Sequence, residues 1–212
     1  MVDRDREEFL PDDPAAFVDR QLAALDDAPL RPGVNVRTTS LAPLREVAAI
    51  CADREAILEL NAHCRQDEMC RAGAGEALLR DTDRLREQVA AAADEGAAVS
   101  VKVRAELPDV DLRATARAVA DAGADAIHVD AMDSEGVIAG VADAADLFVI
   151  ANNGVRDEAT VREYLVYGAD AVSVGRPSDD PAVLRRVRAA TDAWFADDGA
   201  DEAADRSEEV SP

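Results

Sequence analysis

Polar side chains that could do chemistry recur at the ends of short apolar runs in this sequence. They include the only lysine, Lys102, one of the two histidines, His128, and the cysteine Cys64. If these runs are parallel strands, their carboxyl ends meet at one edge of the sheet, where such folds gather their ligands. The sequence therefore predicts a site built from these run ends: Asn35 and Arg37; residues 61–64; Lys102 and Arg104; His128 and Asp130; residues 152–154; Gly175 and Arg176.

Lys102 lies inside an otherwise apolar run, Val-Ser-Val-Lys-Val. An unpaired ammonium in such a run is costly, so an anionic or electron-rich group should meet it. Two interpretations stay open. One is a salt bridge to Glu59 or Asp130 inside the fold, and the other, which we favour, is contact with a bound ligand.

Two run ends near the C-terminus have the composition of a phosphate site. Asn152, Asn153 and Gly154 end one run, and Gly175 and Arg176 end the next. Glycine lets backbone N–H groups approach a phosphate, and a following helix N-terminus adds a favourable dipole. A single glycine is more often only a turn residue, but the pair at consecutive run ends predicts a phosphate site.

Cys64 lies in a polar segment between His63 and Arg65. These potentially cationic neighbours would favour the thiolate, which makes proton transfer by Cys64 a reasonable role. The alternative is a small buried apolar residue. We expect Cys51 and Cys70 to pack, and His63 to line either a pocket or the surface. Three cysteines in a chain that we expect to be cytosolic do not indicate a disulfide framework. The spacing of Cys64 and Cys70, with His63 adjacent, could suggest a metal ion, but no second Cys or His pair follows, so we predict no metal site.

Six short β-branched runs alternate with longer alanine-rich amphipathic segments, a pattern typical of a parallel α/β sheet. The tripeptide Gly-Ala-Asp occurs at residues 123–125 and 168–170, each time between a predicted helix and a predicted strand. We place strands at 34–37, 57–61, 99–104, 126–130, 147–152 and 171–175, and helices at 14–26, 42–53, 76–95, 111–122, 134–144, 156–167 and 180–196.

The helix ends carry start and stop signals. We expect caps or first-turn acids at Asp81, Asp111 and Asp157, and helix stops at Gly96, Gly123 and Gly168. No Gly-x-Gly-x-x-Gly follows the first predicted strand, which disfavours an open dinucleotide-binding sheet. We therefore predict an α/β fold of the parallel (β/α) TIM-barrel type over residues 1–196, in which two of the barrel's eight strand–helix units are unaccounted for. The acidic segment 197–212 is predicted to be a disordered tail.

The chain has 212 residues, with 45 acidic and 23 basic side chains, a formal net charge of −22, and all basic residues except Lys102 are arginine. This composition is typical of a halophile, whose acidic surface keeps the protein soluble in molar salt. It argues against nucleic-acid binding, although strong salt weakens that inference. Since no apolar run could span a bilayer and the start is polar, we expect a cytoplasmic protein that does not bind a membrane.

The segment Glu-Leu-Asn-Ala-His-Cys-Arg at residues 59–65, with Gly-Ala-Gly at 73–75 and Leu-Leu at 78–79, resembles the tRNA-dihydrouridine synthase family. Members of that family have Asn-x-Gly-Cys-Pro followed by Gly-Ala-Gly-x-x-Leu-Leu. The run Val-Ser-Val-Lys-Val-Arg is similar to the family's Val-x-Val-Lys-x-Arg strand. Ala-Ile-His-Val-Asp takes the place of its His-Gly-Arg strand end, and Ile-Ala-Asn-Asn-Gly-Val and Ser-Val-Gly-Arg-Pro are similar to its phosphate-binding strand ends. The resemblance extends over residues 34–190.

The resemblance implies a barrel that binds flavin mononucleotide (FMN). Cys64 would be the general acid that protonates a uracil carbon while reduced FMN delivers hydride to the neighbouring carbon, and Asn61 would hold the pyrimidine. Lys102 and His128 would lie against the flavin ring or the substrate, where a cation stabilises the anionic reduced flavin. The other cofactor-binding residues implied are Arg104 and the phosphate-site residues Asn152, Asn153, Gly154, Gly175 and Arg176.

The chain departs from the family pattern in several places. His-Cys-Arg at residues 63–65 replaces Gly-Cys-Pro, and His-Val-Asp at 128–130 replaces His-Gly-Arg. The predicted strands correspond to strands three to eight of the family's barrel. The first two strands, with an Ala-Pro-Met segment, are missing, and so is the family's C-terminal helical RNA-binding domain. We explain the missing strands by a gene start placed too late, which we favour, or by completion of the barrel through a partner. The short form resembles an archaeal branch related to dihydroorotate dehydrogenases.

The resemblance thus implies an FMN-dependent oxidoreductase that reduces the C5–C6 double bond of uridine in tRNA, using NAD(P)H or another reductant. A flavin enzyme acting on a free dihydropyrimidine or dihydroorotate is one alternative, which the acidic surface favours. A phosphate-binding barrel without redox activity is the other, because the glycine and proline around Cys64 are lost. A homo-oligomer is compatible with each of these functions.

Overall fold

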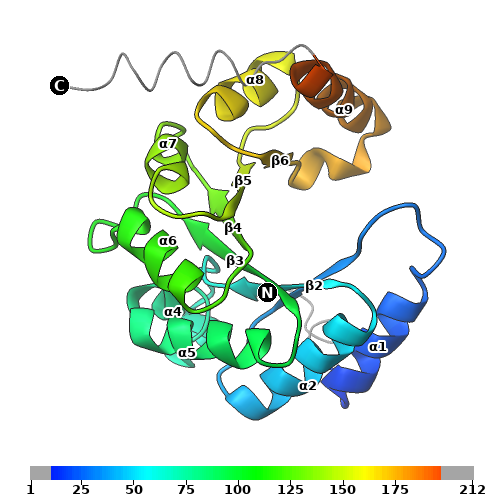
Figure 1. Ribbon diagram of the computed structural model, residues 1–212, viewed down its shortest axis with the longest axis vertical. Helices are drawn as coiled ribbons and strands as arrows, with labels where there is room; N and C mark the ends of the chain where they lie inside the picture. The colour runs from blue at the N-terminus through cyan, green and yellow to red at the C-terminus, as the bar shows by residue number, and fades with distance from the viewer. Residues whose placement is uncertain (1–10, 197–212) are drawn as a thin grey trace. The chain divides into compact units, whose positions relative to one another are not determined.

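The computed structural model describes residues 11–196, so the tail predicted at 197–212 lies outside the described residues. Six parallel strands form one sheet in the order β1-β2-β3-β4-β5-β6 (Figure 1). All six strand predictions are confirmed, and their ends agree within two residues. The strands are β1 (Gly33–Val36), β2 (Ile57–Asn61), β3 (Ala98–Arg104), β4 (Ala126–Asp130), β5 (Phe148–Asn152) and β6 (Ala171–Ser173).

Helices alternate with these strands, as the sequence pattern predicts. They are α1 (Pro14–Ala23), α2 (Leu41–Asp53), α3 (Asp67–Arg71), α4 (Glu76–Arg80), α5 (Thr82–Ala93), α6 (Leu112–Asp121), α7 (Val137–Ala142), α8 (Glu158–Val166) and α9 (Pro181–Ala196), with a 3₁₀ segment η1 (Arg176–Asp179). None of the helices within residues 11–196 is both long enough and apolar enough to cross a bilayer.

The single helix predicted at 76–95 is wrong, because the chain breaks at Asp81. The backbone of Asp81 is not helical, with φ −106° and ψ 76°, and its carboxylate accepts a hydrogen bond from the backbone N–H of Arg84 at 3.2 Å. Asp81 therefore ends α4 and caps α5. The short helix α3 was also not predicted, since its five residues bury no side chain and leave no apolar periodicity in the sequence.

The described chain consists of two compact units, each with its own core. The first contains residues 11–101 and Asp121–Asp125, and there α2 packs against both α1 and α5 (Figure 1). The second contains Lys102–Ala120 and residues 126–196, and there α8 packs against α9. Buried core residues include Leu44, Leu58 and Leu85 in the first unit and Ile127 and Leu165 in the second.

The two Gly-Ala-Asp tripeptides perform the same structural task. The carboxylate of Asp125 accepts the backbone N–H of Val99 at 2.8 Å, while the N–H of Asp125 donates to the carbonyl of Val99 at 2.9 Å. Asp170 makes the equivalent pair of bonds with Val149, at 2.7 and 2.9 Å. Each motif thus fastens the start of one strand to the start of its neighbour. The prediction that the repeat marks one unit used twice is confirmed.

The predicted helix caps are confirmed at the other two aspartates as well. The carboxylate of Asp111 accepts the backbone N–H groups of residues 113 and 114 at 3.0 and 3.2 Å. Asp157 forms a reciprocal capping box with Thr160, and the hydrogen bonds from the backbone and hydroxyl of Thr160 lower the pKa of Asp157 below its usual value. The three predicted stop glycines all have positive φ within three residues of the end of a helix, as helix-ending glycines do.

Candidate functional site

The loop that follows β2 holds Cys64 through the side chain of Asn61. The amide oxygen of Asn61 accepts the backbone N–H groups of His63 at 3.3 Å and Cys64 at 3.0 Å. Asn61 is only 2% exposed, so these bonds lie in the interior and fix the direction in which the chain leaves the strand. Cys64 is half-buried and has a free thiol.

Asn61 is held in turn by side chains from β1, β2 and β3. Its Nδ2 donates to the side-chain oxygen of Asn35 at 2.8 Å, and Asn35 Nδ2 donates to Glu59 Oε1 at 2.8 Å. Ser100 Oγ donates to the other oxygen of Glu59 at 3.3 Å. Asn35 and Glu59 are paired in the β1–β2 register. The second Nδ2 hydrogen of Asn61 has no partner among residues 11–196, so it is available to a ligand.

The surroundings of Gly75 explain why the Gly-Ala-Gly segment has glycine at this position. A Cβ at this position would lie 3.1 Å from the Cβ of Cys64 and in severe overlap, at 2.4 Å, with its carbonyl oxygen. The φ of Gly75 is +61°, a conformation that side chains other than glycine rarely adopt. The Cys64 carbonyl accepts the N–H of Glu76 at 2.9 Å and lies 3.5 Å from Cys70 Sγ. The Cys64 loop therefore rests directly on Gly75.

In the second unit, Lys102 lies beside His128. The ammonium Nζ is 3.4 Å from Nε2 of His128, which is 7% exposed. Because an ammonium only donates, this contact requires a lone pair on Nε2 and a proton on Nδ1. The other two ammonium hydrogens of Lys102 have no partner within the described part of the chain. The partner of Lys102 in the structure is thus His128, and not Glu59 or Asp130, the two carboxylates that the sequence suggested.

The chain leaves three neighbouring strands through strained residues. Glu106 after β3, Met132 after β4 and Asn153 after β5 have φ of 64°, 55° and 109°. Such strain persists only where the surroundings enforce it, and it concentrates at functional sites. Two hydrogen bonds hold the backbone conformation of Asn153. Its Nδ2 donates to Asp130 Oδ1 at 3.1 Å, and its carbonyl accepts the hydroxyl of Tyr164 at 2.8 Å.

Arg104 ends β3 and is 6% exposed. Its Nη2 lies 3.8 Å from the sulfur of Met132, which also lies 3.9 Å from Nδ2 of Asn153. The ends of β3, β4 and β5 are therefore joined through one methionine. Asp130 and Asn152 are paired in the β4–β5 register, which brings these strand ends level with one another.

The residues of the predicted phosphate site lie at equivalent positions in the two loops that follow β5 and β6. Asn152 of β5 is paired with Ser173 of β6, and Gly154 and Gly175 each lie two residues after their member of this pair. Asn152 Nδ2 donates to the carbonyl of Ser173 at 2.9 Å, and a Cβ on Gly175 would have only an ordinary 3.9 Å contact with that Nδ2. Gly154 has φ +67°, and Arg176 is exposed.

The helix dipole expected at this phosphate site is weaker than predicted. The segment after Gly175 is η1, a 3₁₀ segment of four residues, whose few aligned peptides give little dipole. The N-termini of the longer helices α8 and α9 already have aspartate caps, since Asp157 accepts from Thr160 N–H at 3.1 Å and Asp180 accepts from Ala182 N–H at 2.8 Å. A phosphate here would depend on the glycine loops and Arg176.

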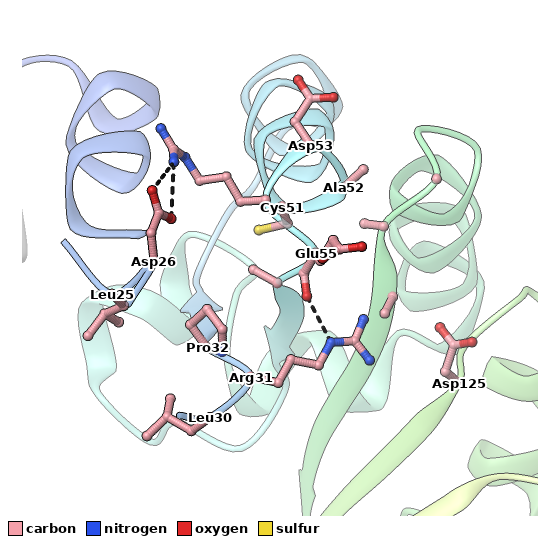
Figure 2. Close-up of a pocket in the computed structure, with 15 residues that line it drawn as sticks. Leu25, Asp26, Leu30, Arg31, Pro32, Cys51, Ala52, Asp53, Glu55 and Asp125 are labelled. Atoms are coloured by element: carbon pink, nitrogen blue, oxygen red, sulfur yellow. Dashed lines mark hydrogen bonds and ion pairs between the residues drawn. The ribbon is translucent and has the colours of Figure 1, made fainter. Parts of the chain in front are cut away.

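A cavity of about 1260 Å³ lies at the other end of the strands in the first unit, before β1, β2 and β3 (Figure 2). Arg31 Nε donates to the carbonyl of Glu55 at 2.8 Å, and Arg54 pairs with Asp26 at 3.4 Å. Cys51 lies in its wall, and burial raises the pKa of that thiol to about 11. The prediction that Cys51 packs is confirmed. Because Cys64 follows β2 and this cavity precedes it, the cavity is not part of the candidate site.

Sequence reasoning missed three side chains that support these clusters: Ser100, Met132 and Tyr164. Tyr164 could have been found, because it is one of two tyrosines in an aromatic-poor chain and lies on the helix after the predicted phosphate loop. Its hydroxyl is buried, and this burial together with nearby carboxylates raises the pKa of Tyr164 above its usual value. Nothing in the local sequence singles out Ser100 or Met132.

Comparison with known proteins gives a family and a fold. The family model described as dihydrouridine synthase matches residues 18–203. An uncharacterized protein of Methanocaldococcus jannaschii is 29% identical over 153 residues, which is 68% of this chain and 58% of that protein. This chain therefore spans less than two thirds of the length of that curated relative.

Solved structures with low sequence identity show the same fold. DHODH from Eimeria tenella in complex with ferulenol has a TM-score of 0.69 at 16% identity, over 90% of this chain and 66% of that one. A putative phosphonomutase from Burkholderia cenocepacia has a TM-score of 0.61 at 22% identity, over 83% of this chain and 74% of that one. The fold is thus of the α/β TIM-barrel class, as predicted, and these likenesses show the fold alone.

Proposed function

Because the chain belongs to the dihydrouridine synthase family, we propose that it is an FMN-dependent oxidoreductase that reduces the C5–C6 double bond of uridine in tRNA. The single observation that supports this most is the loop of Cys64, the proposed proton donor. A buried asparagine and a close-packed glycine, both part of the family motif, hold this loop in place. NAD(P)H is the reductant that we propose.

The second unit has residues that fit a flavin nucleotide. Lys102 has two ammonium hydrogens left for an electron-rich ring, and Gly154 and Gly175 expose backbone at two adjoining strand ends. When bound, FMN supplies the hydride. Lys102 would stabilise negative charge on the ring, with His128 holding the ammonium in place. The phosphate would be held by the two glycine loops, Asn152, Asn153 and Arg176, with Arg104 positioning the neighbouring strand end through Met132.

The first unit has residues that fit the proton-transfer half of the reaction. Reduction of a C5–C6 double bond needs one hydride and one proton on adjacent carbons, so a proton donor must be held at a fixed place. The Cys64 thiol would give that proton. The remaining Nδ2 hydrogen of Asn61 would donate to a carbonyl of the pyrimidine, while the amide oxygen keeps the loop in position.

One observation favours a free pyrimidine over tRNA as the substrate. A net charge of −22 repels a polyanion in dilute buffer, and only high salt removes that penalty. The two substrates are separated by measuring dihydrouridine in tRNA from a strain that lacks the gene. Loss of the modified base from a defined position supports tRNA, and unchanged tRNA together with turnover of free dihydropyrimidine or dihydroorotate supports the alternative.

The experiment that tests the assigned roles compares two variants with matched controls. Cys64→Ala should abolish substrate reduction and leave FMN bound, whereas Cys70→Ala, in α3 directly after that loop, should keep most activity. Lys102→Ala should weaken FMN binding, whereas Arg117→Ala, an exposed cation on α6, should not. Full turnover by Cys64→Ala would overturn its role as the acid, and unchanged FMN affinity in Lys102→Ala would overturn the flavin contact.

A further inference from the structure

A second cysteine lies in the short helix that follows the loop of the proposed proton donor. Cys70, in α3, has its sulfur 3.5 Å from the carbonyl oxygen of Cys64. Both cysteines are half-buried, whereas Cys51 is fully buried. The mechanism proposed above gives Cys70 no task, and its thiol is nevertheless in contact with the one residue whose thiol the mechanism needs.

The two sulfurs are within reach of each other after a small local change. The carbonyl oxygen and Cβ of one residue are roughly 3 Å apart. Cys70 Sγ therefore lies at most about 6.5 Å from the Cβ of Cys64, and a disulfide requires about 3 Å between these atoms. Asn61 and Gly75 hold the Cys64 loop in place, whereas α3, which carries Cys70, has five residues and buries none of them. Rearranging such a segment disrupts little packing.

We propose that Cys64 and Cys70 form a reversible disulfide when the protein meets hydrogen peroxide. The Cys64 thiolate attacks one peroxide oxygen, the O–O bond breaks, and Cys64 becomes a sulfenic acid as hydroxide leaves. The thiolate of Cys70 then attacks the Cys64 sulfur, the S–O bond breaks and a second hydroxide leaves, which takes up a proton to form water. Two thiols are oxidised by two electrons, and one peroxide is reduced to two waters.

The disulfide has a direct consequence for the reaction, and this part rests on the proposed function. A disulfide sulfur has no proton to give, so reduction of the pyrimidine stops until a dithiol restores Cys64. The disulfide also protects Cys64, because a sulfenic acid that finds no thiol is oxidised further to the irreversible sulfinic acid. Cys70 is thus a resolving cysteine for Cys64.

The test uses the full chain without flavin or substrate, so its outcome does not depend on the proposed activity. The protein is treated with hydrogen peroxide, free thiols are blocked with N-ethylmaleimide, and trypsin digestion follows. Cleavage after arginine places Cys51, Cys64 and Cys70 in three separate peptides, residues 46–54, 55–65 and 66–71. We expect peptides 55–65 and 66–71 to appear linked, with a loss of two hydrogens that dithiothreitol reverses. Peptide 46–54 should carry N-ethylmaleimide on its cysteine, which shows that this thiol was not oxidised.

Variants identify the order of the steps. Cys70→Ser should leave Cys64 as a sulfenic acid that dimedone labels, and longer exposure should give the sulfinic acid. Cys64→Ser should leave Cys70 unoxidised, and Cys51→Ala should still form the linked pair. The proposal is overturned if the wild-type chain gives sulfinic acid or untouched thiol at Cys64 instead of the linked peptides. It is also overturned if the link joins two chains, which non-reducing electrophoresis detects.

Discussion

Replacing Gly75 by alanine should displace the Cys64 loop. The new methyl group would overlap with the carbonyl oxygen of Cys64, at 2.4 Å, and lie 3.1 Å from its Cβ. These atoms belong to backbone and a short side chain, so they cannot move aside without shifting the loop. The change also forces alanine into a φ of +61°. Both effects raise the free energy of the folded state, and they exceed the opposing gain of about 0.4–1 kcal/mol from the reduced backbone freedom of the unfolded chain.

The magnitude follows from these two contributions. Holding a residue other than glycine in a sparsely populated backbone region costs about 1–3 kcal/mol. Overpacking a close contact costs about 1–3 kcal/mol more. Partial relaxation of the loop lowers the sum, so we expect a loss of about 3 kcal/mol in the free energy of unfolding. For a domain of this size that corresponds to a fall in Tm of roughly 6–12 °C.

Two further glycines make matched controls, measured by thermal unfolding followed by circular dichroism. Gly96→Ala meets the same backbone strain at φ +84° but has only a 3.9 Å contact, so it should lose about 1 kcal/mol. Gly136→Ala has φ −61° and nothing within 4 Å, so its Tm should be unchanged. The reasoning is refuted if Gly75→Ala unfolds at the same temperature as Gly96→Ala, because the contact with Cys64 would then cost nothing.

Three smaller perturbations test other parts of the structure. Asp170→Ala leaves the buried N–H of Val149 unpaired and should lower the free energy of unfolding in urea by about 1–3 kcal/mol. Tyr164→Phe removes the hydroxyl that holds the Asn153 carbonyl, so it should cost about 1 kcal/mol and weaken FMN binding in a fluorescence titration. Burial raises the pKa of Cys51 from 9.0 to about 11. The thiol of the unfolded chain ionises first, so the contribution of Cys51 to the free energy of unfolding is complete below pH 9 and falls by on the order of 2 kcal/mol as the pH rises from 9 to 11. In Cys51→Ala this alkaline loss of stability should disappear.

Each of these has its own control and contrary outcome. Asp179→Ala removes an exposed carboxylate and should leave the urea midpoint unchanged, and an equal loss in both aspartate variants would show that strand fastening is not the cause. Tyr167→Phe should bind FMN as the wild type does, and equal weakening in both tyrosine variants would contradict the role of the Asn153 contact. Cys70→Ala should keep the alkaline loss of stability; if Cys51→Ala keeps it as well, Cys51 does not titrate as its burial requires.

The strands and their polar ends could be predicted from the sequence because each strand is a short, continuous apolar run with a polar residue directly after it. Asn61, Asp130 and Asn152 therefore fall where the sequence places them, at the last residues of β2, β4 and β5. Helix interiors carry a weaker signal. Asp81 is expected as a cap or first-turn acid, but it lies within one long amphipathic segment. Only its backbone dihedrals and its bond to Arg84 show that one helix ends and another starts there.

The contacts that organise the candidate site could not be predicted, because they join residues far apart in the chain. Asn61 depends on Asn35, 26 positions earlier, and Lys102 meets His128, 26 positions later. The sequence shows that Lys102 needs a partner but does not show which one. Gly75 illustrates the same limit: its place in the motif is visible, whereas the carbonyl oxygen that excludes a side chain there is visible only in three dimensions.

The visible absorption spectrum of the purified chain shows whether this chain binds FMN, on which the proposed function depends. The protein is incubated with FMN in molar potassium chloride and the excess is removed by gel filtration, with Lys102→Ala and Arg117→Ala treated in parallel. We predict a flavin band of about one FMN per chain, retained in Arg117→Ala and reduced in Lys102→Ala. A wild-type chain that elutes folded and without any flavin band would contradict the proposed function.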